Sequence, residues 1–231
     1  SVLTKMSKHS IVVVIPAFNE ATQLGRVLEA MPSQINGLAV RSLVVDDGSN
    51  DRTSYIARSH GAFVVRHLTN LGVGAATRTG FLAATELDAE VVVTMDADGQ
   101  HDPGDMGQLV RCVMEEGYDV AIGNRMIRPK GMPASRVAAN WLLNVITLLV
   151  YRGSVSDSQS GFKCFTARAL QLMDLKADGY DVCSEIVGEI FAKKLRYKSI
   201  PVKTVYTTYS RAKGQHFLNG VNIILQLLVR M

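Results

Sequence analysis

The sequence predicts an α/β fold in a single domain, with a mostly parallel β-sheet flanked by helices. Two observations predict this fold. Short apolar runs rich in β-branched residues, as in strands buried on both faces, alternate with segments whose apolar residues recur at helical spacing. The length of 231 residues suits one α/β domain, and 47% hydrophobic with 20% charged residues excludes a disordered chain.

The first half of the chain alternates strand and helix signals. Apolar runs predict strands at residues 11–15, 42–45, 62–66, 91–95 and 118–124. Helical spacing follows the first, second and fourth of these strands, and residues 70–86 read as a glycine-interrupted loop that becomes a helix. A capping side chain before a proline predicts a helix start at Asp102, and we expect Asn19 and Asn50-Asp51 to cap the two earlier helices. Such short repeats predict parallel strands wrapped by helices.

The second half carries two segments that are apolar around most of a helix circumference. Residues 133–151 have one narrow polar stripe, and residues 217–231 repeat the design. Such helices lie in the core, at an interface between chains, or on a bilayer surface, and the pattern leaves these alternatives open. No apolar run reaches the roughly 18 to 20 residues that a membrane span requires. The remaining expectations are a polar turn at 156–162, a strand at 163–165, a helix at 181–195, a strand at 198–209 and a basic loop at 210–214.

Charge and cysteine content limit the partners. A formal net charge of +4 and a pI near 9.0 suit anionic ligands or an anionic membrane surface, and are too weak to indicate nucleic-acid binding. Cys112, Cys164 and Cys183 are scattered without CxxC spacing, which predicts reduced core thiols and no zinc site. We expect no signal peptide and a cytoplasmic protein.

Acidic side chains follow three of the predicted strands. Glu20, the pair Asp46-Asp47, and Asp96 with Asp98 come after strands whose carboxyl ends meet at one edge of a parallel sheet, where α/β proteins bind ligands. Two carboxylates separated by one residue suit Mg²⁺ or Mn²⁺, which would also hold phosphate oxygens. The alternative is that each carboxylate is a solvated helix cap. The GxGxxG and P-loop nucleotide fingerprints are absent.

A basic loop with glycine and proline follows the strand predicted at 118–124. Its cationic residues are Arg125, Arg128, Lys130 and Arg136. Beside a carboxylate-held cation, such a loop can clamp phosphate groups. An ordinary solvated loop is the alternative.

Six short motifs occur in order along the chain. They are Ile15-Pro16-Ala17-Phe18-Asn19-Glu20, Val45-Asp46-Asp47-Gly48-Ser49, Asn70-x-Gly72, Asp96-Ala97-Asp98-Gly99-Gln100-His101, Gly123-Asn124-Arg125 and Asp157-x-x-Ser160-Gly161-Phe162. Together, from about residue 11 to residue 214, they resemble the family-2 glycosyltransferases of GT-A fold, and within them the dolichyl- or polyprenyl-phosphate mannose and glucose synthases. The resemblance implies a Rossmann-like GT-A domain over residues 1–231, with a nucleotide-binding half at about 10–125 and an acceptor- and membrane-side half at about 126–231.

The resemblance also implies a role for each motif. The residues implied for the donor nucleotide are Pro16, Ala17, Phe18, Glu20, Asp47, Asp96, Ala97 and Arg211, with the turn at 16–20 receiving base and ribose and Asp47 bonding the base. Those implied for Mg²⁺ or Mn²⁺ are Asp96, Asp98 and Gln100. Arg125 matches an arginine near the donor diphosphate and the acceptor phosphate. Arg136 and Asn140 match an acceptor-phosphate pair.

The implied reaction moves a hexose from a UDP- or GDP-sugar to polyprenyl or dolichyl phosphate, with inversion at the anomeric carbon. Negative charge accumulates on the departing diphosphate, so a cation and arginines aimed at its oxygens supply the main electrostatic stabilisation. A lipid phosphate acceptor is already anionic. Asp157 therefore either positions the acceptor or, for a hydroxyl acceptor, acts as the base. The implied location is peripheral to the cytosolic membrane face.

Two positions depart from the mannose-synthase pattern. Gln215-His216-Phe217 stands where that branch usually has Glu-Ser-Lys, and Gly99 stands where leucine is common. Without a lysine expected to contact phosphate, UDP-glucose and UDP-linked N-acetylhexosamine are donors as defensible as GDP-mannose. A soluble transferase with a saccharide or small hydroxyl acceptor is the first alternative function. The second is a sugar-nucleotide-binding module without turnover.

Overall fold

The computed structural model describes residues 10–127, 134–153 and 155–205. The strands are β1 (Ser10–Ala17), β2 (Gln34–Ile35), β3 (Leu38–Asp46), β4 (Phe63–Arg66), β5 (Val91–Thr94), β6 (Val120–Asn124), β7 (Lys163–Thr166) and β8 (Tyr197–Pro201). The α-helices are α1 (Ala21–Glu29), α2 (Thr53–Ser59), α3 (Val73–Glu86), α4 (Met106–Met114), α5 (Ala134–Tyr151), α6 (Ala167–Leu172) and α7 (Val182–Ala192). A 3-10 turn, η1 (Pro103–Asp105), leads into α4.

The strands form one mixed, mostly parallel sheet, as the sequence predicts. Its order is β2-β3-β1-β5-β7-β6-β8, and β4 pairs with β3. The pairs β1/β3, β1/β5, β3/β4 and β6/β8 are parallel. Strand β7 runs antiparallel to both of its neighbours, β5 and β6, and so joins the two parallel halves of the sheet. The parallel order β4-β3-β1-β5 brings the carboxyl ends of these strands to one edge.

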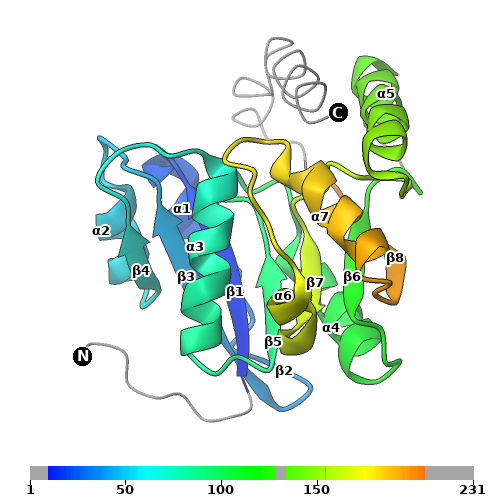
Figure 1. Cartoon of the computed structure of the whole chain (residues 1–231). Helices are drawn as coiled ribbons and strands as arrows, with labels where there is room; N and C mark the ends of the chain where they lie inside the picture. The colour runs from blue at the N-terminus through cyan, green and yellow to red at the C-terminus, as the bar shows by residue number, and fades with distance from the viewer. Residues whose placement is uncertain (1–9, 128–133, 154, 206–231) are drawn as a thin grey trace.

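Helices cover both faces of the sheet, and each face has its own apolar core. Odd-numbered residues of β1, such as Ile11, Val13 and Ile15, pack against α1, α2 and α4. The even-numbered Val12 and Val14 pack with residues of α3, α6 and α7 on the opposite face. Figure 1 shows α3 and α6 in front of the sheet and α1 behind it. Burial on both faces explains why β1 reads as a continuous apolar run.

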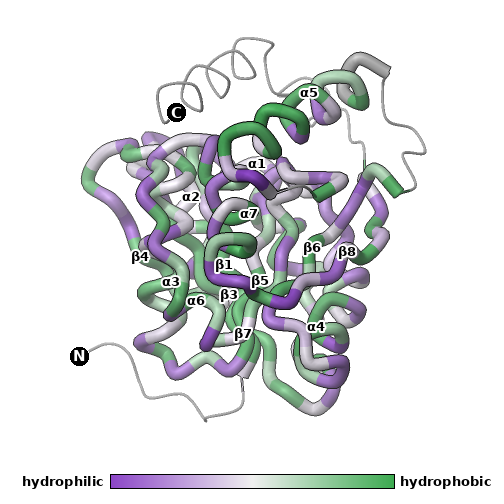
Figure 2. The backbone as a smooth tube through the Cα atoms, turned by 45° about the vertical axis from the view of Figure 1, so that its right-hand side comes forward, coloured by the Kyte–Doolittle hydropathy of each residue, from purple (hydrophilic) through white to green (hydrophobic). Residues whose placement is uncertain are grey.

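Helix α5 stands apart from these two layers. It lies beyond the carboxyl edge of the sheet and reaches the body mainly through α7 (Figure 1). Its apolar colouring in Figure 2 extends over the part that faces away from the body. Trp141 is 65% exposed and Leu149 is 67% exposed, so this helix leaves large apolar side chains uncovered. None of the helices in the described residues is long and apolar enough to span a bilayer.

Several predicted boundaries need correction. The strand expected at 198–209 is described only as far as residue 205. Within that part, β8 spans Tyr197–Pro201, and a single bridge between His101 and Thr204 follows it. Asn19 does not cap α1. It has a left-handed backbone (φ 54°), and its side-chain oxygen accepts a hydrogen bond from the Asn50 amide at 2.9 Å. The start at Asp102 is confirmed, since its carboxylate accepts from the Gly104 amide at 2.9 Å.

Candidate active site

The three acidic segments lie together at the carboxyl edge of the sheet. They follow β1, β3 and β5, which are neighbouring parallel strands in register. The turn after β1 is fastened to the segment after β3 by hydrogen bonds from its backbone amides to side-chain hydroxyls. The Glu20 amide donates to the Thr53 hydroxyl at 2.9 Å, and the Asn19 amide donates to the Ser49 hydroxyl at 2.9 Å. Phe18 remains 40% exposed on this turn, which leaves an aromatic surface open to a ligand.

The two carboxylates after β3 organise the surrounding loops. Asp46 is fully buried, and its pKa lies below the ordinary value because hydrogen bonds from Ser49 and Ser54 outweigh the effect of burial. Asp47 accepts hydrogen bonds from the amides of Leu71 and Gly72 at 2.9 and 2.8 Å. His67 also pairs with Asp47 at 2.7 Å.

The implied base-binding residue Asp47 thus lies on the expected edge, where it holds the loop that contains Asn70-x-Gly72. Its contact with a base stays a prediction. The loop is tightly seated, because Gly48 has a left-handed backbone (φ 76°) and a Cβ there would fall 2.5 Å from the Thr69 carbonyl carbon. Asp47 therefore sets the shape of the nucleotide-side loop even before any ligand contact is considered.

The predicted metal pair follows β5. One oxygen of Asp96 accepts a hydrogen bond from Nε2 of the buried His101 at 3.0 Å, and the Asp96 side chain is 46% exposed. Asp98 accepts from the Gln100 backbone amide at 2.9 Å, and the Gln100 side-chain amide also donates to it. His101 in turn stacks against Phe162, with ring centroids 5.1 Å apart.

Electrostatics at this pair suit a divalent cation. Partial loss of solvent around Asp96 raises its pKa, but His101, Arg125 and Lys163 bring the pKa below the ordinary value. Burial and the negative charge of Asp96 raise the pKa of Asp98. A cation between the two carboxylates would relieve this repulsion. Among the described residues no group of three or more His, Cys, Asp or Glu side chains is arranged to hold a metal. Proteins usually bind Mg²⁺ through one or two carboxylates, and substrate phosphate oxygens complete the coordination. Asp96 and Asp98 therefore fit this cation.

Arg125 and Asp157 form a buried ion pair beside the metal pair. Asp157 is fully buried, and its carboxylate accepts from the Arg125 backbone amide, Nε and Nη2 at 2.9, 2.8 and 2.8 Å. The Asn140 amide donates the fourth bond at 2.9 Å. Burial raises the pKa of Asp157, but the hydrogen bonds and charge of Arg125 outweigh burial, so the pKa of Asp157 lies below its ordinary value. Burial lowers the pKa of Arg125, but the hydrogen bonds and charge of Asp157 outweigh burial, so the pKa of Arg125 lies above its ordinary value.

This arrangement bears on two predicted roles. A carboxylate has about four lone-pair directions, and those of Asp157 are all used, so the geometry favours positioning of Arg125 over action as a general base. Asn140, implied for the acceptor phosphate, lies in the same cluster. Its side-chain oxygen is buried and has no hydrogen-bond partner among the described residues. The side chain of Arg136 and the whole of Arg211 lie outside the described residues.

Three residues at the site had no assigned role in the sequence analysis. His101 orients Asp96, Gly161 lies against it, and Lys163 contributes a buried positive charge. A Cβ at Gly161 would fall 2.3 Å from Asp96 Oδ1, so only glycine fits there. The motifs contained His101 and Gly161, but nothing local in the sequence indicates that they meet at Asp96. The three cysteines are free thiols, with Cys112 and Cys164 buried and Cys183 partly buried, as expected.

The model of glycosyl transferase family 2 matches residues 12–173. The chain belongs to this family. An uncharacterized protein of Methanocaldococcus jannaschii is 41% identical over 100% of this chain and 96% of its own length. The UDP-N-acetylglucosamine–dolichyl-phosphate N-acetylglucosaminyltransferase of Methanococcus voltae is 33% identical over 97% of each chain. The polyprenol monophosphomannose synthase of Mycolicibacterium smegmatis is 30% identical over 91% of this chain and 82% of its own.

Solved structures show the same fold. Glucosyl-3-phosphoglycerate synthase from Mycobacterium tuberculosis, in complex with phosphoglyceric acid, superposes with a TM-score of 0.71 at 24% identity, over 96% of this chain and 80% of that chain. The same enzyme has been solved with Mn²⁺, UDP and glucosyl-3-phosphoglycerate, with a TM-score of 0.68 to this chain. The predicted GT-A architecture is therefore confirmed, and this family-2 chain resembles polyprenyl-phosphate sugar transferases.

Proposed function

We propose that the protein transfers a hexose from a nucleotide diphosphate sugar to a polyprenyl or dolichyl phosphate, with Mg²⁺ or Mn²⁺ as cofactor. One observation carries the proposal: the fully bonded Asp157 cannot take a proton readily, whereas Arg125 is held beside the metal pair. A phosphate acceptor is already ionised and needs no base. A hydroxyl acceptor would need one, so the geometry favours the phosphate.

Each group of site residues has a separate role in this proposal. Asp96 and Asp98 would hold the cation, which neutralises charge on the departing diphosphate when bound. Arg125, which Asp157 holds in place, would lie near both phosphate groups in this proposal. The turn at residues 16–20 and Asp47 form the nucleotide side of the site. Pre-organised charges of this kind cost no reorganisation when the leaving group departs.

The membrane is the source of the acceptor in this proposal. Helix α5 exposes Trp141, Leu142, Leu148 and Leu149 at the same end of the molecule as the site (Figures 1 and 2). A polyprenyl chain stays in the bilayer, so an apolar face near the site suits a protein that rests on the cytosolic membrane surface. Residues 217–231, which share the same sequence pattern, lie outside the described residues.

The donor we propose to test first is UDP-N-acetylglucosamine, because the Methanococcus voltae relative is named for it and matches almost the whole of both chains. The test is transfer of labelled sugar from UDP-N-acetylglucosamine, UDP-glucose and GDP-mannose to polyprenyl phosphate in vesicles with Mn²⁺. We expect label in the organic phase with one donor. Label only in water-soluble products would favour the soluble transferase, and donor binding without any product would favour a binding module.

A further inference from the structure

Lys163 is a buried cation that has no counter-ion in contact among the described residues. Its side chain, on β7, is among the fully buried side chains of the protein. The ammonium donates a hydrogen bond to the Ser160 carbonyl oxygen. Within the described ranges it makes no second hydrogen bond and no ion pair. Since an ammonium carries three donors, two remain unmatched, which is costly for a buried charge. Buried polar groups without partners are expected mainly at functional sites.

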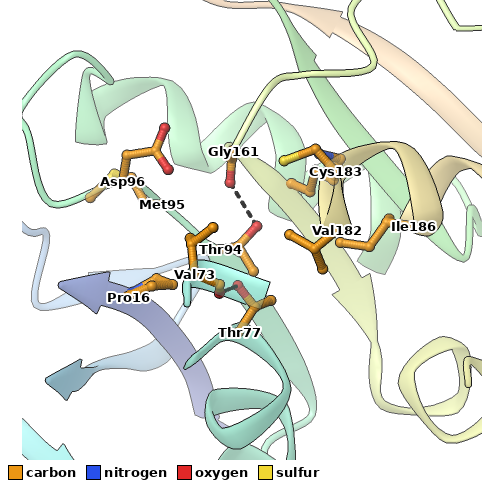
Figure 3. A pocket seen from close by; sticks show the side chains of 11 residues that line it. Pro16, Val73, Thr77, Thr94, Met95, Asp96, Gly161, Val182, Cys183 and Ile186 are labelled. Atoms are coloured by element: carbon orange, nitrogen blue, oxygen red, sulfur yellow. Dashed lines mark hydrogen bonds between the residues drawn. The ribbon is translucent and has the colours of Figure 1, made fainter. Parts of the chain in front are cut away.

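Lys163 lines a small cavity whose wall also includes Asp96 of the metal pair. The cavity measures about 30 Å³, and its wall includes Pro16 and Asp96 from two of the donor motifs, together with Gly161 and Cys183 (Figure 3). Other polar groups of the wall already have partners. The Thr94 hydroxyl donates to the Gly161 carbonyl at 2.8 Å, as Figure 3 shows, and the Thr77 hydroxyl donates within α3.

A volume of about 30 Å³ leaves room for at least one water-sized polar group of a ligand. Asp96 would meet the donor diphosphate, and the hexose is bonded directly to that diphosphate, so the hexose would lie within reach of this cavity. An oxygen on that sugar would supply the acceptor that the ammonium lacks.

We propose that Lys163 binds the donor sugar, by donating a hydrogen bond to an oxygen-bearing substituent of the hexose that occupies this cavity. The inference rests on the proposed function, since it takes a nucleotide sugar as the ligand. It adds a contact that selects the sugar, separate from those that hold the nucleotide. A different role is that Lys163 only offsets the negative charge of Asp96. In that case it would affect metal-dependent binding of the nucleotide and of the nucleotide sugar equally.

Isothermal titration of Lys163→Met in the full chain with Mn²⁺ separates these roles. The ligands are the nucleotide sugar that the wild-type chain binds, among UDP-N-acetylglucosamine, UDP-glucose and GDP-mannose, and the matching UDP or GDP. We expect the affinity for the nucleotide sugar to fall about tenfold or more, and the affinity for the nucleotide to stay within about twofold. Lys176→Met, at an exposed lysine, should change neither.

An equal change in both affinities, or no change in either, would overturn the proposal. Lys163→Gln retains a donor for the Ser160 carbonyl and covers the case in which the methionine variant does not fold. If neither variant folds, Lys163 serves stability and the proposal is also overturned. A wild-type chain that binds none of these nucleotides would contradict the proposed function itself, which is a distinct result.

Discussion

Replacing Asp157 by asparagine tests the role of the buried ion pair. The substitution preserves the size of the side chain, removes its charge and leaves Arg125, whose side chain is 16% exposed, without its counter-ion. Removing one partner of a buried ion pair costs about 3–5 kcal/mol. This is a large share of a typical total of about 5–15 kcal/mol. At about 2–4 °C per kcal/mol for a chain of this size, the Tm should fall by about 6–20 °C.

Urea unfolding followed by circular dichroism measures this loss. The matched control is the double variant Asp157→Asn with Arg125→Met, which removes both charges and should recover part of the stability. The reasoning fails if Asp157→Asn lowers the free energy of unfolding by less than about 1 kcal/mol while it abolishes transfer. That result would return Asp157 to the role of general base.

The same ion pair makes stability depend on pH. The pKa of Asp157 is lower in the folded protein than its ordinary value, because the bonds and charge of Arg125 outweigh the effect of burial. Such a carboxylate contributes stability above its unfolded pKa, near 3.9, and loses that contribution as pH falls through the folded pKa. The free energy of unfolding should therefore decrease as pH is lowered below about 5. Asp157→Asn should make this slope shallower, and an unchanged slope would contradict the assignment.

Three further predictions concern the metal pair and α5. Asp98→Asn should abolish Mn²⁺-dependent nucleotide binding in calorimetry with little change in Tm, and unchanged binding would remove Asp98 from the metal site. Gly161→Ala should weaken Mn²⁺-dependent nucleotide binding about tenfold or more, because its Cβ would fall 2.3 Å from a carboxylate oxygen of the pair. Gly107→Ala, where a Cβ has no neighbour within 4 Å, is the control and should bind normally. Trp141→Ser combined with Leu149→Ser should reduce flotation with anionic liposomes, and equal flotation would exclude this face as a membrane contact.

The fold was predictable because its main signals are local. The run at residues 11–15 is buried on both faces in β1, and Asp102 starts a helical turn as its side-chain chemistry predicts. The antiparallel direction of β7 was not predictable, because it depends on how the chain returns to the sheet after α5 and not on the residues of β7. Asn19 failed as a predicted cap because a partner 31 residues away, Asn50, competes for its side-chain oxygen.

The candidate site was predictable in position but not in its internal contacts. The motifs place carboxylates at strand ends, and parallel pairing brings those ends together. The hydrogen bonds that use all acceptor positions of the Asp157 carboxylate were not predictable. Their donors, Arg125 and Asn140, lie 32 and 17 residues away, at a strand end and in a helix. The same holds for Lys163, which reads as an ordinary polar residue at the start of a strand. Its burial is set by the neighbouring strands and α7.

Transfer to lipid with and without metal tests the central claim most directly. Purified protein, labelled nucleotide sugar and polyprenyl phosphate in vesicles are incubated with EDTA, and then with Mn²⁺ in excess over EDTA. The account predicts labelled lipid in the organic phase only after Mn²⁺ is restored, and none at any time with Asp98→Asn. Labelled lipid formed equally in EDTA, or formed by the variant at the wild-type rate, would contradict it.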